Sequence, residues 1–312
     1  MMSKIAVVFP GQGSQFLGMG KDIYDRYDEI KDLFSKAESI INKDIKSICF
    51  DGPENVLAQT ENTQPAIFLV SIALFQLLQK SGIRPVFLAG HSLGEISAYY
   101  AAGVLDLETA LKLIEFRGKA MASSTSSDIH GMAAVIGGDV NTIKKLTQDY
   151  SMNHQDTVVV ANYNSLEQVV ISGTKTAITG ITPLLTENGI KRVIPLPVSG
   201  AFHSPFMEKA SESLSKFIES LNFMDAKNPI VLNRTASPEQ NASNLKTNLA
   251  LQVKSSVLWI DTIQFIQAQC DVIIECGPGK VLSGLIRKIN KDLNVQNVSN
   301  FESLEKIFEL HR

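Results

Sequence analysis

The sequence predicts an α/β protein built on a largely parallel sheet. Short apolar runs of strand length occur at Ile5–Phe9, Pro85–Ala89 and Val272–Ile274. Helix-like segments separate them, and this alternation is typical of a parallel sheet covered by helices. The 312 residues are 44% hydrophobic with a net charge of −3. A large core is therefore expected, and the chain lacks the basic excess of a nucleic-acid-binding protein.

The segments between these strands show the apolar periodicity of helices. We expect helices at Tyr24–Ile41, Thr63–Lys80, Ile96–Leu105 and Asp106–Ala122. The second of them is expected to begin at Thr63 as the capping residue, with Pro65 in its first turn. Its apolar run, Ala66–Leu78, is too short to span a bilayer and indicates a buried helix.

The middle of the chain has a different organisation, which begins after a serine-rich linker at Ser123–Asp128. The expected elements are a strand at Met132–Ile136, a helix at Val140–Tyr150, strands at Thr157–Asn162 and Gln168–Ser172, a helix at Ala177–Asn188 and a strand at Lys191–Leu196. This β-α-β-β-α-β order is that of a ferredoxin-like unit. We therefore expect a small subdomain at residues 128–196, inserted into a core formed by residues 1–127 and 197–312.

The sequence Gly90-His91-Ser92-Leu93-Gly94 lies between a predicted strand and a predicted helix. A serine flanked by glycines in that context is typical of a nucleophile elbow, a strained turn that exposes the hydroxyl. The following helix begins with free N–H groups, which stabilise an anion. Ser92 is thus the candidate nucleophile.

A serine nucleophile needs a base, and His203 is the strongest candidate. It lies in the unusual loop Pro197–Pro205, whereas His130, His154 and His311 lie in polar linker or terminal segments. A neutral imidazole accepts the serine proton and returns it to a leaving thiol. His91 is better explained as a turn residue with a satisfied ring, and a purely structural role for His203 stays open.

Arg117 is expected to point inward from its helix. It is three residues from Ile114 and four from Met121, both on the apolar face. A buried guanidinium needs an anionic partner. That partner is either an internal Asp or Glu, or a substrate carboxylate held by two parallel hydrogen bonds.

Two glycine-rich loops do not match nucleotide-binding motifs. In Gly11-Gln12-Gly13-Ser14-Gln15-Phe16, phenylalanine stands where the dinucleotide motif has its third glycine, and Gly277–Lys280 lacks the Ser/Thr of a phosphate loop. The first loop follows the first strand, so it lies at the edge where α/β folds bind ligands. It either donates a backbone N–H to an oxyanion hole or is a plain tight turn.

The targeting and redox features predict a cytoplasmic protein. The N-terminal Met1–Lys4 leads directly into a strand, so no signal peptide is expected. The cysteines, Cys49, Cys270 and Cys276, are odd in number and lack metal-binding spacing. Free structural thiols in a reducing compartment explain them best.

Several motifs together resemble one family. In chain order they are Phe9–Gln15, Gly90–Glu95, Arg117-Gly118, Gln168–Gly173, Gly200–Ser204 and Glu275–Lys280. In this order they resemble the malonyl-CoA:acyl carrier protein transacylases of type II fatty acid synthesis. The resemblance implies a larger α/β-hydrolase-like core with a parallel sheet and a smaller ferredoxin-like subdomain.

The resemblance also implies roles for individual residues. Ser92 would accept the acyl group, His203 would be the base, and Arg117 would bind the malonyl carboxylate. The Gln12 and Leu93 amides would form the oxyanion hole. Further matched positions are Gln252, whose backbone carbonyl would orient the His203 ring, Asn162, which would line the cleft, and Phe202, which follows the malonyl-preferring pattern. Ser256 departs from the family, which usually has proline there.

The implied substrates are malonyl-CoA and acyl carrier protein, with no metal or redox cofactor, no nucleic acid and no membrane. Carrier proteins of this pathway are acidic, so a locally basic docking face is expected. Its candidate residues are Lys191, Arg192, Lys280, Arg287, Lys288 and Lys291. An ordinary solvated helix face explains these charges equally well.

Two other functions stay open. A serine thioesterase or esterase would use the same elbow but pass the acyl group to water, and Arg117 and the missing triad acid weigh against it. A non-catalytic scaffold that binds carrier protein is the other, and the intact Ser92 and His203 weigh against it.

Overall fold

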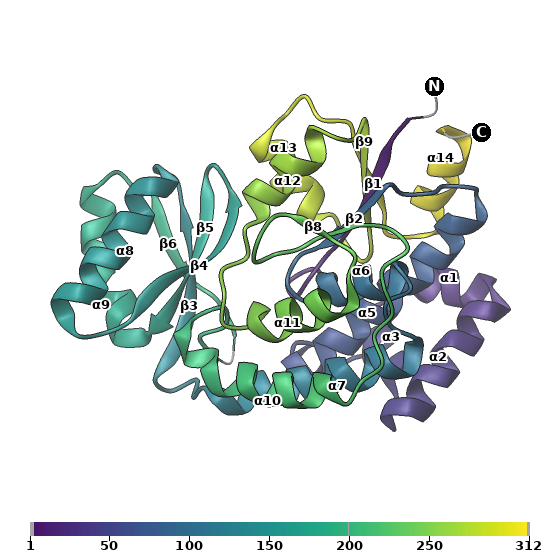
Figure 1. Cartoon of the computed structure of the whole chain (residues 1–312), viewed down its shortest axis with the longest axis horizontal. Coiled ribbons are helices and arrows are strands. Elements are labelled where there is room, and N and C mark those ends of the chain that lie inside the picture. The colour runs from purple at the N-terminus through teal and green to yellow at the C-terminus, as the bar shows by residue number, and fades with distance from the viewer. Residues whose placement is uncertain (1–2, 199, 311–312) are drawn as a thin grey trace.

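The computed structural model describes residues 3–198 and 200–310, so Ser199 of the His203 loop and His311 lie outside the described residues (Figure 1). The larger sheet has six strands in the order β10-β9-β1-β2-β7-β8. They are β1 (Ile5–Phe9), β2 (Phe87–Gly90), β7 (Ile230–Val231), β8 (Pro238–Glu239), β9 (Val272–Cys276) and β10 (Val295–Val298). All neighbours pair in parallel except β7 and β8. The predicted α/β class with a largely parallel sheet is confirmed.

The central strands are apolar throughout because helices cover both faces of this sheet. Along β1, Val7 and Phe9 join one core cluster, and Ala6 and Val8 join another on the opposite face. The helices are α1 (Lys21–Arg26), α2 (Asp28–Ile41), α3 (Ile45–Phe50), α4 (Glu54–Leu57), α5 (Thr60–Lys80), α6 (Gly94–Ala101), α7 (Leu107–Ser124), α10 (Glu208–Glu219), α11 (Ala242–Gln252), α12 (Trp259–Gln267), α13 (Val281–Ile289) and α14 (Phe301–Leu310), with a 3₁₀ turn at Pro205–Met207.

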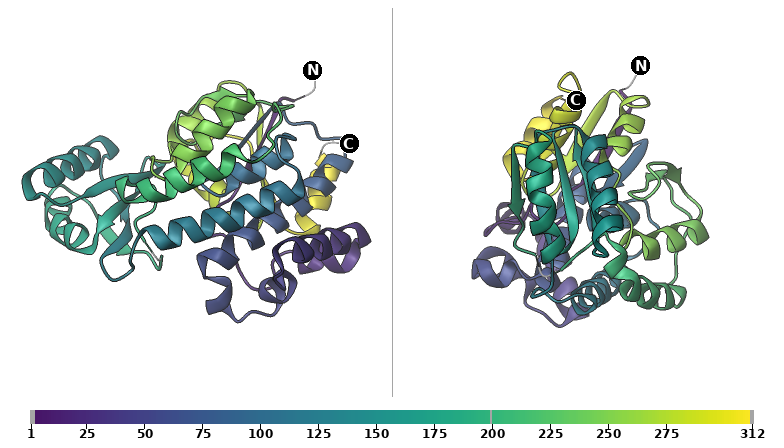
Figure 2. Two further views of the ribbon diagram at one scale, coloured as in Figure 1. Left: turned by 60° about the horizontal axis from the view of Figure 1, so that its bottom comes forward. Right: turned by 90° about the vertical axis from the view of Figure 1, so that its left-hand side faces the viewer.

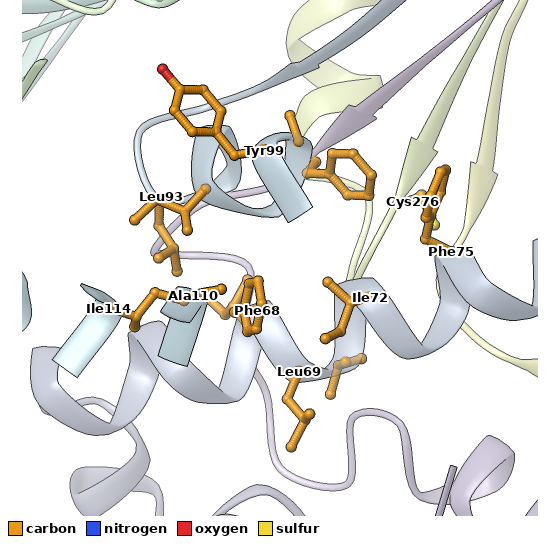
Figure 3. Packing of buried hydrophobic residues seen from close by; sticks show 14 of the residues in the cluster. Phe68, Leu69, Ile72, Phe75, Leu93, Tyr99, Ala110, Ile114 and Cys276 are labelled. Atoms are coloured by element: carbon orange, nitrogen blue, oxygen red, sulfur yellow. The ribbon is translucent and has the colours of Figure 1, made fainter. Parts of the chain in front are cut away.

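The larger core cluster centres on α5, which is buried on nearly all sides, as the apolar run predicts. Figure 3 shows Phe68, Ile72 and Phe75 of this helix facing residues of α6, α7 and β9. The Phe75 ring packs edge-on against Phe9 of β1, with 5.5 Å between the ring centroids. This packing fixes the first strand, and with it the Gly11–Gln15 loop that follows.

The second sheet has four strands, all antiparallel, in the order β4-β5-β3-β6. They are β3 (His130–Ile136), β4 (Val158–Ser165), β5 (Gln168–Thr174) and β6 (Arg192–Pro195), with helices α8 (Val140–His154) and α9 (Lys175–Glu187). These helices cover the outer face of the sheet, which projects from the larger part of the molecule (Figure 2). On the inner face, Met132 and Val170 pack into the larger core cluster.

Several element boundaries differ from the sequence-based expectation. The helix expected at Ile96–Leu105 is α6, which begins at Gly94 and ends at Ala101. The helix expected at Tyr24–Ile41 is two helices, broken at Tyr27, whose backbone is extended. The helix α5 begins at Thr60, and the Thr63 hydroxyl donates to the Leu57 carbonyl instead of capping. The expected linker begins inside α7, which continues to Ser124. No helix within residues 3–198 and 200–310 is long and apolar enough to cross a membrane.

Candidate active site

The predicted strained turn is present at the end of β2. Ser92 has a positive φ of 51°, and the helix α6 begins two residues later at Gly94. A Cβ atom on Gly90 would overlap the Gly94 carbonyl group, and one on Gly94 would overlap the Phe9 carbonyl oxygen. Both glycines are therefore required by close backbone approach, and they make room for the turn.

The Ser92 hydroxyl meets the ring of His203, which is 4% exposed. Ser92 Oγ lies 2.8 Å from His203 Nε2. The other ring nitrogen, Nδ1, lies 3.1 Å from the Gln252 carbonyl oxygen and 3.0 Å from that of Ser255. Because both of these groups accept hydrogen bonds, Nδ1 carries the proton and Nε2 is free to accept the serine proton.

The electrostatic environment keeps this imidazole neutral. Burial, together with the positive charge of Arg117, lowers the pKa of His203 to about 3. At neutral pH the ring is therefore a proton acceptor. Two backbone carbonyls occupy the position that a carboxylate takes in a Ser-His-Asp triad.

Arg117 is buried, as its place on the apolar face of α7 predicts, with 1% of its surface exposed. Its Nη1 donates to Gln64 Oε1 at 3.0 Å, and its Nη2 donates to Gln252 Oε1 at 2.9 Å and to Ser92 Oγ at 3.1 Å. None of the ion pairs among the described residues involves Arg117. No Asp or Glu of the described residues therefore forms a salt bridge with Arg117, although buried Glu95 interacts with it electrostatically at longer range.

The groups that accept hydrogen bonds from Arg117 are therefore all neutral, and the buried Glu95 carboxyl interacts with its charge only at longer range. Burial lowers the pKa of Arg117 to about 10, so the side chain stays cationic at neutral pH. Its Nε atom is buried and has no hydrogen-bond partner among the described residues. A buried cation that lies beside a serine hydroxyl, with no carboxylate within salt-bridge distance, is able to bind an anionic group.

Gln252, at the end of α11, contacts all three of these residues. Its backbone carbonyl accepts from His203, and its side-chain Oε1 accepts from Arg117. Its Nε2 donates to the Ser92 carbonyl oxygen at 2.9 Å. That carbonyl shares a peptide plane with the Leu93 N–H, so this hydrogen bond also fixes the direction of the Leu93 amide.

Two residues beside Ser92 have backbone amides without a hydrogen-bond partner among the described residues. They are Gln12 and Leu93, which both line the cavity around Ser92. The loop that carries Gln12 lies directly against the elbow. A Cβ atom on Gly11 would overlap the His91 carbonyl oxygen, so only glycine allows this close approach.

The cavity has a volume of about 450 Å³ and lies between the larger sheet and the four-stranded sheet. The site residues predicted from the sequence that line it are Gln12, Ser92, Leu93, Arg117, Asn162, Phe202 and His203. Asn162 and Phe202 are each 6% exposed. Gln252 lies behind Arg117 and His203. Among the described residues, no group of three or more His, Cys, Asp or Glu side chains is arranged to hold a metal ion.

His91 has the satisfied ring expected of a turn residue. Its Nε2 lies 2.8 Å from Asn164 Oδ1, and its ring packs edge-on against Trp259. The residues that sequence reasoning missed are Gln64, Asn164 and Asn233. Gln64 had no distinctive local signal, since the first turn of α5 also carries the buried polar residues Thr60, Asn62 and Thr63.

The basic residues predicted to bind a carrier protein form two separate groups. Lys280, Arg287 and Lys288 are exposed at α13, which contacts β4 at one edge of the four-stranded sheet. Lys191 and Arg192 are exposed at the start of β6, the opposite edge strand. A single partner would have to span the width of this sheet to contact both groups, about 14 Å across three strand spacings.

A serine in a strained turn, a neutral histidine and two unpaired amides are typical of α/β enzymes that carry an acyl group on serine. The comparison with known families agrees with this class. The chain belongs to the acyl transferase domain family, whose model matches residues 6–307.

The relatives extend over nearly the whole chain. A malonyl CoA-acyl carrier protein transacylase of Bacillus subtilis (strain 168) is 40% identical over 305 residues, covering 97% of this chain and 96% of that protein. The crystal structure of an acyl carrier protein S-malonyltransferase from Vibrio cholerae has a TM-score of 0.94 and 38% identity, covering 98% and 100% of the two chains. A malonyl-transacylase in complex with a type II polyketide acyl carrier protein has a TM-score of 0.95 and 35% identity, covering 99% and 100%.

Proposed function

We propose that the protein transfers the malonyl group of malonyl-CoA to the phosphopantetheine thiol of acyl carrier protein, through an ester on Ser92. The relatives named above support the substrates. The observation that carries the proposal is the position of Arg117, whose Nη2 lies 3.1 Å from Ser92 Oγ with no carboxylate partner. In malonyl-CoA one methylene group separates the free carboxylate from the thioester carbonyl, so a cation this close to the nucleophile fits that acyl group.

In the first half-reaction, Ser92 Oγ attacks the thioester carbonyl carbon while His203 Nε2 takes the hydroxyl proton. The negative charge that develops on the carbonyl oxygen is stabilised by the Gln12 and Leu93 amides. The C–S bond then breaks, and His203 returns the proton to the departing coenzyme A thiolate. Malonyl-Ser92 and free coenzyme A result.

The second half-reaction runs the same steps in reverse. The thiol of the carrier protein gives its proton to His203 and attacks the ester carbonyl. The C–O bond to Ser92 breaks, the hydroxyl regains its proton, and malonyl carrier protein leaves. These steps consist only of acyl and proton transfers, so none of them requires a metal or redox cofactor, and coenzyme A takes part as a portion of the substrate.

The roles of the remaining cavity residues follow from this arrangement. Gln252 would orient His203 and Arg117 together, and Asn162 would line the cleft for the substrate. Phe202, which precedes His203 and is 6% exposed, would limit the space available to acyl groups larger than malonyl.

The carboxylate role of Arg117 is tested by Arg117→Ala. We expect kcat/KM for malonyl-CoA to fall about 100-fold, as the loss of two charge-assisted hydrogen bonds implies. Transfer from acetyl-CoA should fall by less than tenfold. Arg117→Lys keeps the charge without the two-pronged geometry, and its malonyl transfer should be intermediate. An equal loss for both acyl groups in Arg117→Ala would contradict the proposal.

We also propose a finer description of the fold and its surroundings. Residues 128–196 would be a ferredoxin-like subdomain inserted into an α/β-hydrolase-like core of residues 1–127 and 197–312, a proposal that the antiparallel order β4-β5-β3-β6 supports. Free cysteines at Cys49, Cys270 and Cys276 favour the cytoplasm.

We propose that exposed basic side chains attract the acidic carrier protein. They are Lys191, Arg192, Lys280, Arg287 and Lys288. Charge reversal at Arg287 and Lys288 should therefore raise the KM for carrier protein and leave the KM for malonyl-CoA unchanged.

A further inference from the structure

The strained conformation of Ser92 must be held by something besides the two flanking glycines. A φ of 51° is in the left-handed region, which costs free energy for any residue with a Cβ atom. Gly90 and Gly94 leave room for the turn, but they supply no hydrogen bond that favours it. Hydrogen bonds to the Gly90 carbonyl and to the Ser92 N–H, on either side of His91, would stabilise the turn in this conformation.

The side chain of Asn233 makes both of these hydrogen bonds. Its Oδ1 accepts from the Ser92 N–H at 2.7 Å, and its Nδ2 donates to the Gly90 carbonyl at 2.5 Å. The contact arises from the sheet topology. Asn233 follows β7, which pairs in parallel with β2, so both strands end at the same edge. The amide thus brackets the turn from the neighbouring strand.

The backbone of Asn233 connects the turn to two further segments. Its N–H donates to Glu95 Oε2 at 2.6 Å, in the first turn of α6. Its carbonyl accepts from the Leu258 N–H at 2.8 Å. Leu258 lies three residues after Ser255, whose carbonyl contacts His203 Nδ1. Asn233 is fully buried, and it joins the segment of the nucleophile to the segment that orients the base.

These contacts also determine which amide is available to the substrate. The Ser92 N–H is occupied by Asn233, so it does not serve the cavity. The next amide, that of Leu93, has no partner among the described residues. Asn233 is not among the residues that line the cavity and makes no hydrogen bond to Arg117.

We propose that Asn233 is a positioning residue that holds Ser92 in its strained conformation and directs its hydroxyl toward His203. This inference rests on the proposed role of Ser92 as the nucleophile. Since Asn233 does not contact the substrate cavity, its loss should slow the chemical step and leave substrate binding nearly unchanged.

The test compares Asn233→Ala with a matched variant, Asn228→Ala. Asn228 precedes β7 and donates to the Pro85 carbonyl at 2.8 Å, so it joins the same two strands at their opposite end. We expect Asn233→Ala to lower kcat about 100-fold, as a misplaced nucleophile does, with the KM for malonyl-CoA within threefold of wild type. Asn228→Ala should lose comparable thermal stability and keep kcat within threefold.

A folded Asn233→Ala enzyme with a wild-type kcat would overturn the proposal. So would a fall in kcat that Asn228→Ala shares, or a KM that rises as much as kcat falls. If Asn233→Ala does not fold, Asn233→Asp replaces it. The aspartate keeps the size and the acceptor for Ser92 but cannot donate to Gly90 when ionised, and its kcat should lie between wild type and a 100-fold loss.

A second probe tests the role of Asn233 independently of the assignment of malonyl-CoA as the substrate. Phenylmethylsulfonyl fluoride modifies an activated serine without needing a carboxylate or coenzyme A. The rate of Ser92 modification, followed by intact mass, should fall about 100-fold in Asn233→Ala and remain unchanged in Asn228→Ala. If wild type reacts with this reagent but not with malonyl-CoA, the substrate assignment fails while the role of Asn233 stands. Equal reaction rates in all three proteins would contradict the role of Asn233.

Discussion

At the scale of single residues, the malonyl specificity that we propose depends on the absence of a carboxylate among the hydrogen-bond partners of Arg117. Its two amide partners, Gln64 and Gln252, accept hydrogen bonds but carry no charge. A carboxylate in either position would neutralise the guanidinium before substrate arrives. Neutral partners therefore hold the side chain in place and leave its charge for the acyl carboxylate that we propose it binds.

This reasoning predicts that Gln64→Glu weakens the preference for malonyl-CoA over acetyl-CoA. The new carboxylate would pair with Arg117, so kcat/KM for malonyl-CoA should fall about 100-fold. Transfer from acetyl-CoA should stay within threefold of wild type. Gln79→Glu, on the same helix, adds the same charge without touching Arg117 and should change neither rate. Rates for both acyl groups that fall together in Gln64→Glu would argue against the prediction.

The sequence could predict the site residues that lie in recognisable local patterns. Ser92 is in a glycine-flanked turn, and Arg117 is on the apolar face of a helix. Asn233 has no such pattern, since it is one asparagine in a loop after a two-residue strand. Its role depends on the parallel pairing of β7 with β2, which no local sequence feature specifies.

At the scale of elements, the site depends on how closely the turn between β2 and α6 approaches β1. A Cβ on Gly94 would overlap the Phe9 carbonyl oxygen, whereas a Cβ on Gly284 in α13 meets nothing within 4 Å. Gly94→Ala should therefore displace the elbow, lowering kcat/KM at least 100-fold and lowering the Tm.

The matched substitution Gly284→Ala should keep full activity. It should also raise stability by about 0.5–1 kcal/mol, because alanine favours a helix. Thermal unfolding and malonyl transfer would be measured for both variants. An active, stable Gly94→Ala enzyme would show that the close approach is not required.

One element boundary that the sequence did not predict coincides with a tertiary contact. Periodicity placed the apolar face of the first long helical segment correctly but missed its break at Tyr27. The Tyr27 ring packs against Phe301 in the last helix, with 6.4 Å between the centroids. A contact between the two ends of the chain leaves no trace in the local pattern.

At the scale of the whole molecule, the burial of His203 makes the free energy of unfolding depend on pH. The folded-state pKa of His203 is about 3, below its ordinary value of 6.5. Between these two values the unfolded chain binds a proton that the folded chain does not. Stability from this group is therefore full above pH 6.5 and decreases as pH falls toward 3.

His203→Asn removes this linkage. Between about pH 4 and 6, the free energy of unfolding of wild type should rise with pH more steeply than that of the variant, by about 1.4 kcal/mol per pH unit. Burial also raises the pKa of Glu95 from 4.5 to about 7. Above pH 4.5 this shift makes the free energy of unfolding decrease as the pH rises, which is the opposite of the His203 effect. Glu95 is common to both proteins, so comparison by urea unfolding cancels its effect. Parallel pH profiles would mean that His203 is not buried in its neutral form.

The central claim is that Ser92 carries the malonyl group between two thiols. The most direct measurement is intact mass after brief exposure to malonyl-CoA, for wild type and Ser92→Ala in parallel, followed by addition of carrier protein. We predict one malonyl adduct on wild type only, discharged onto the carrier thiol. An adduct lost to water without carrier protein would indicate a thioesterase. The absence of any adduct, or an equal adduct on Ser92→Ala, would contradict the account.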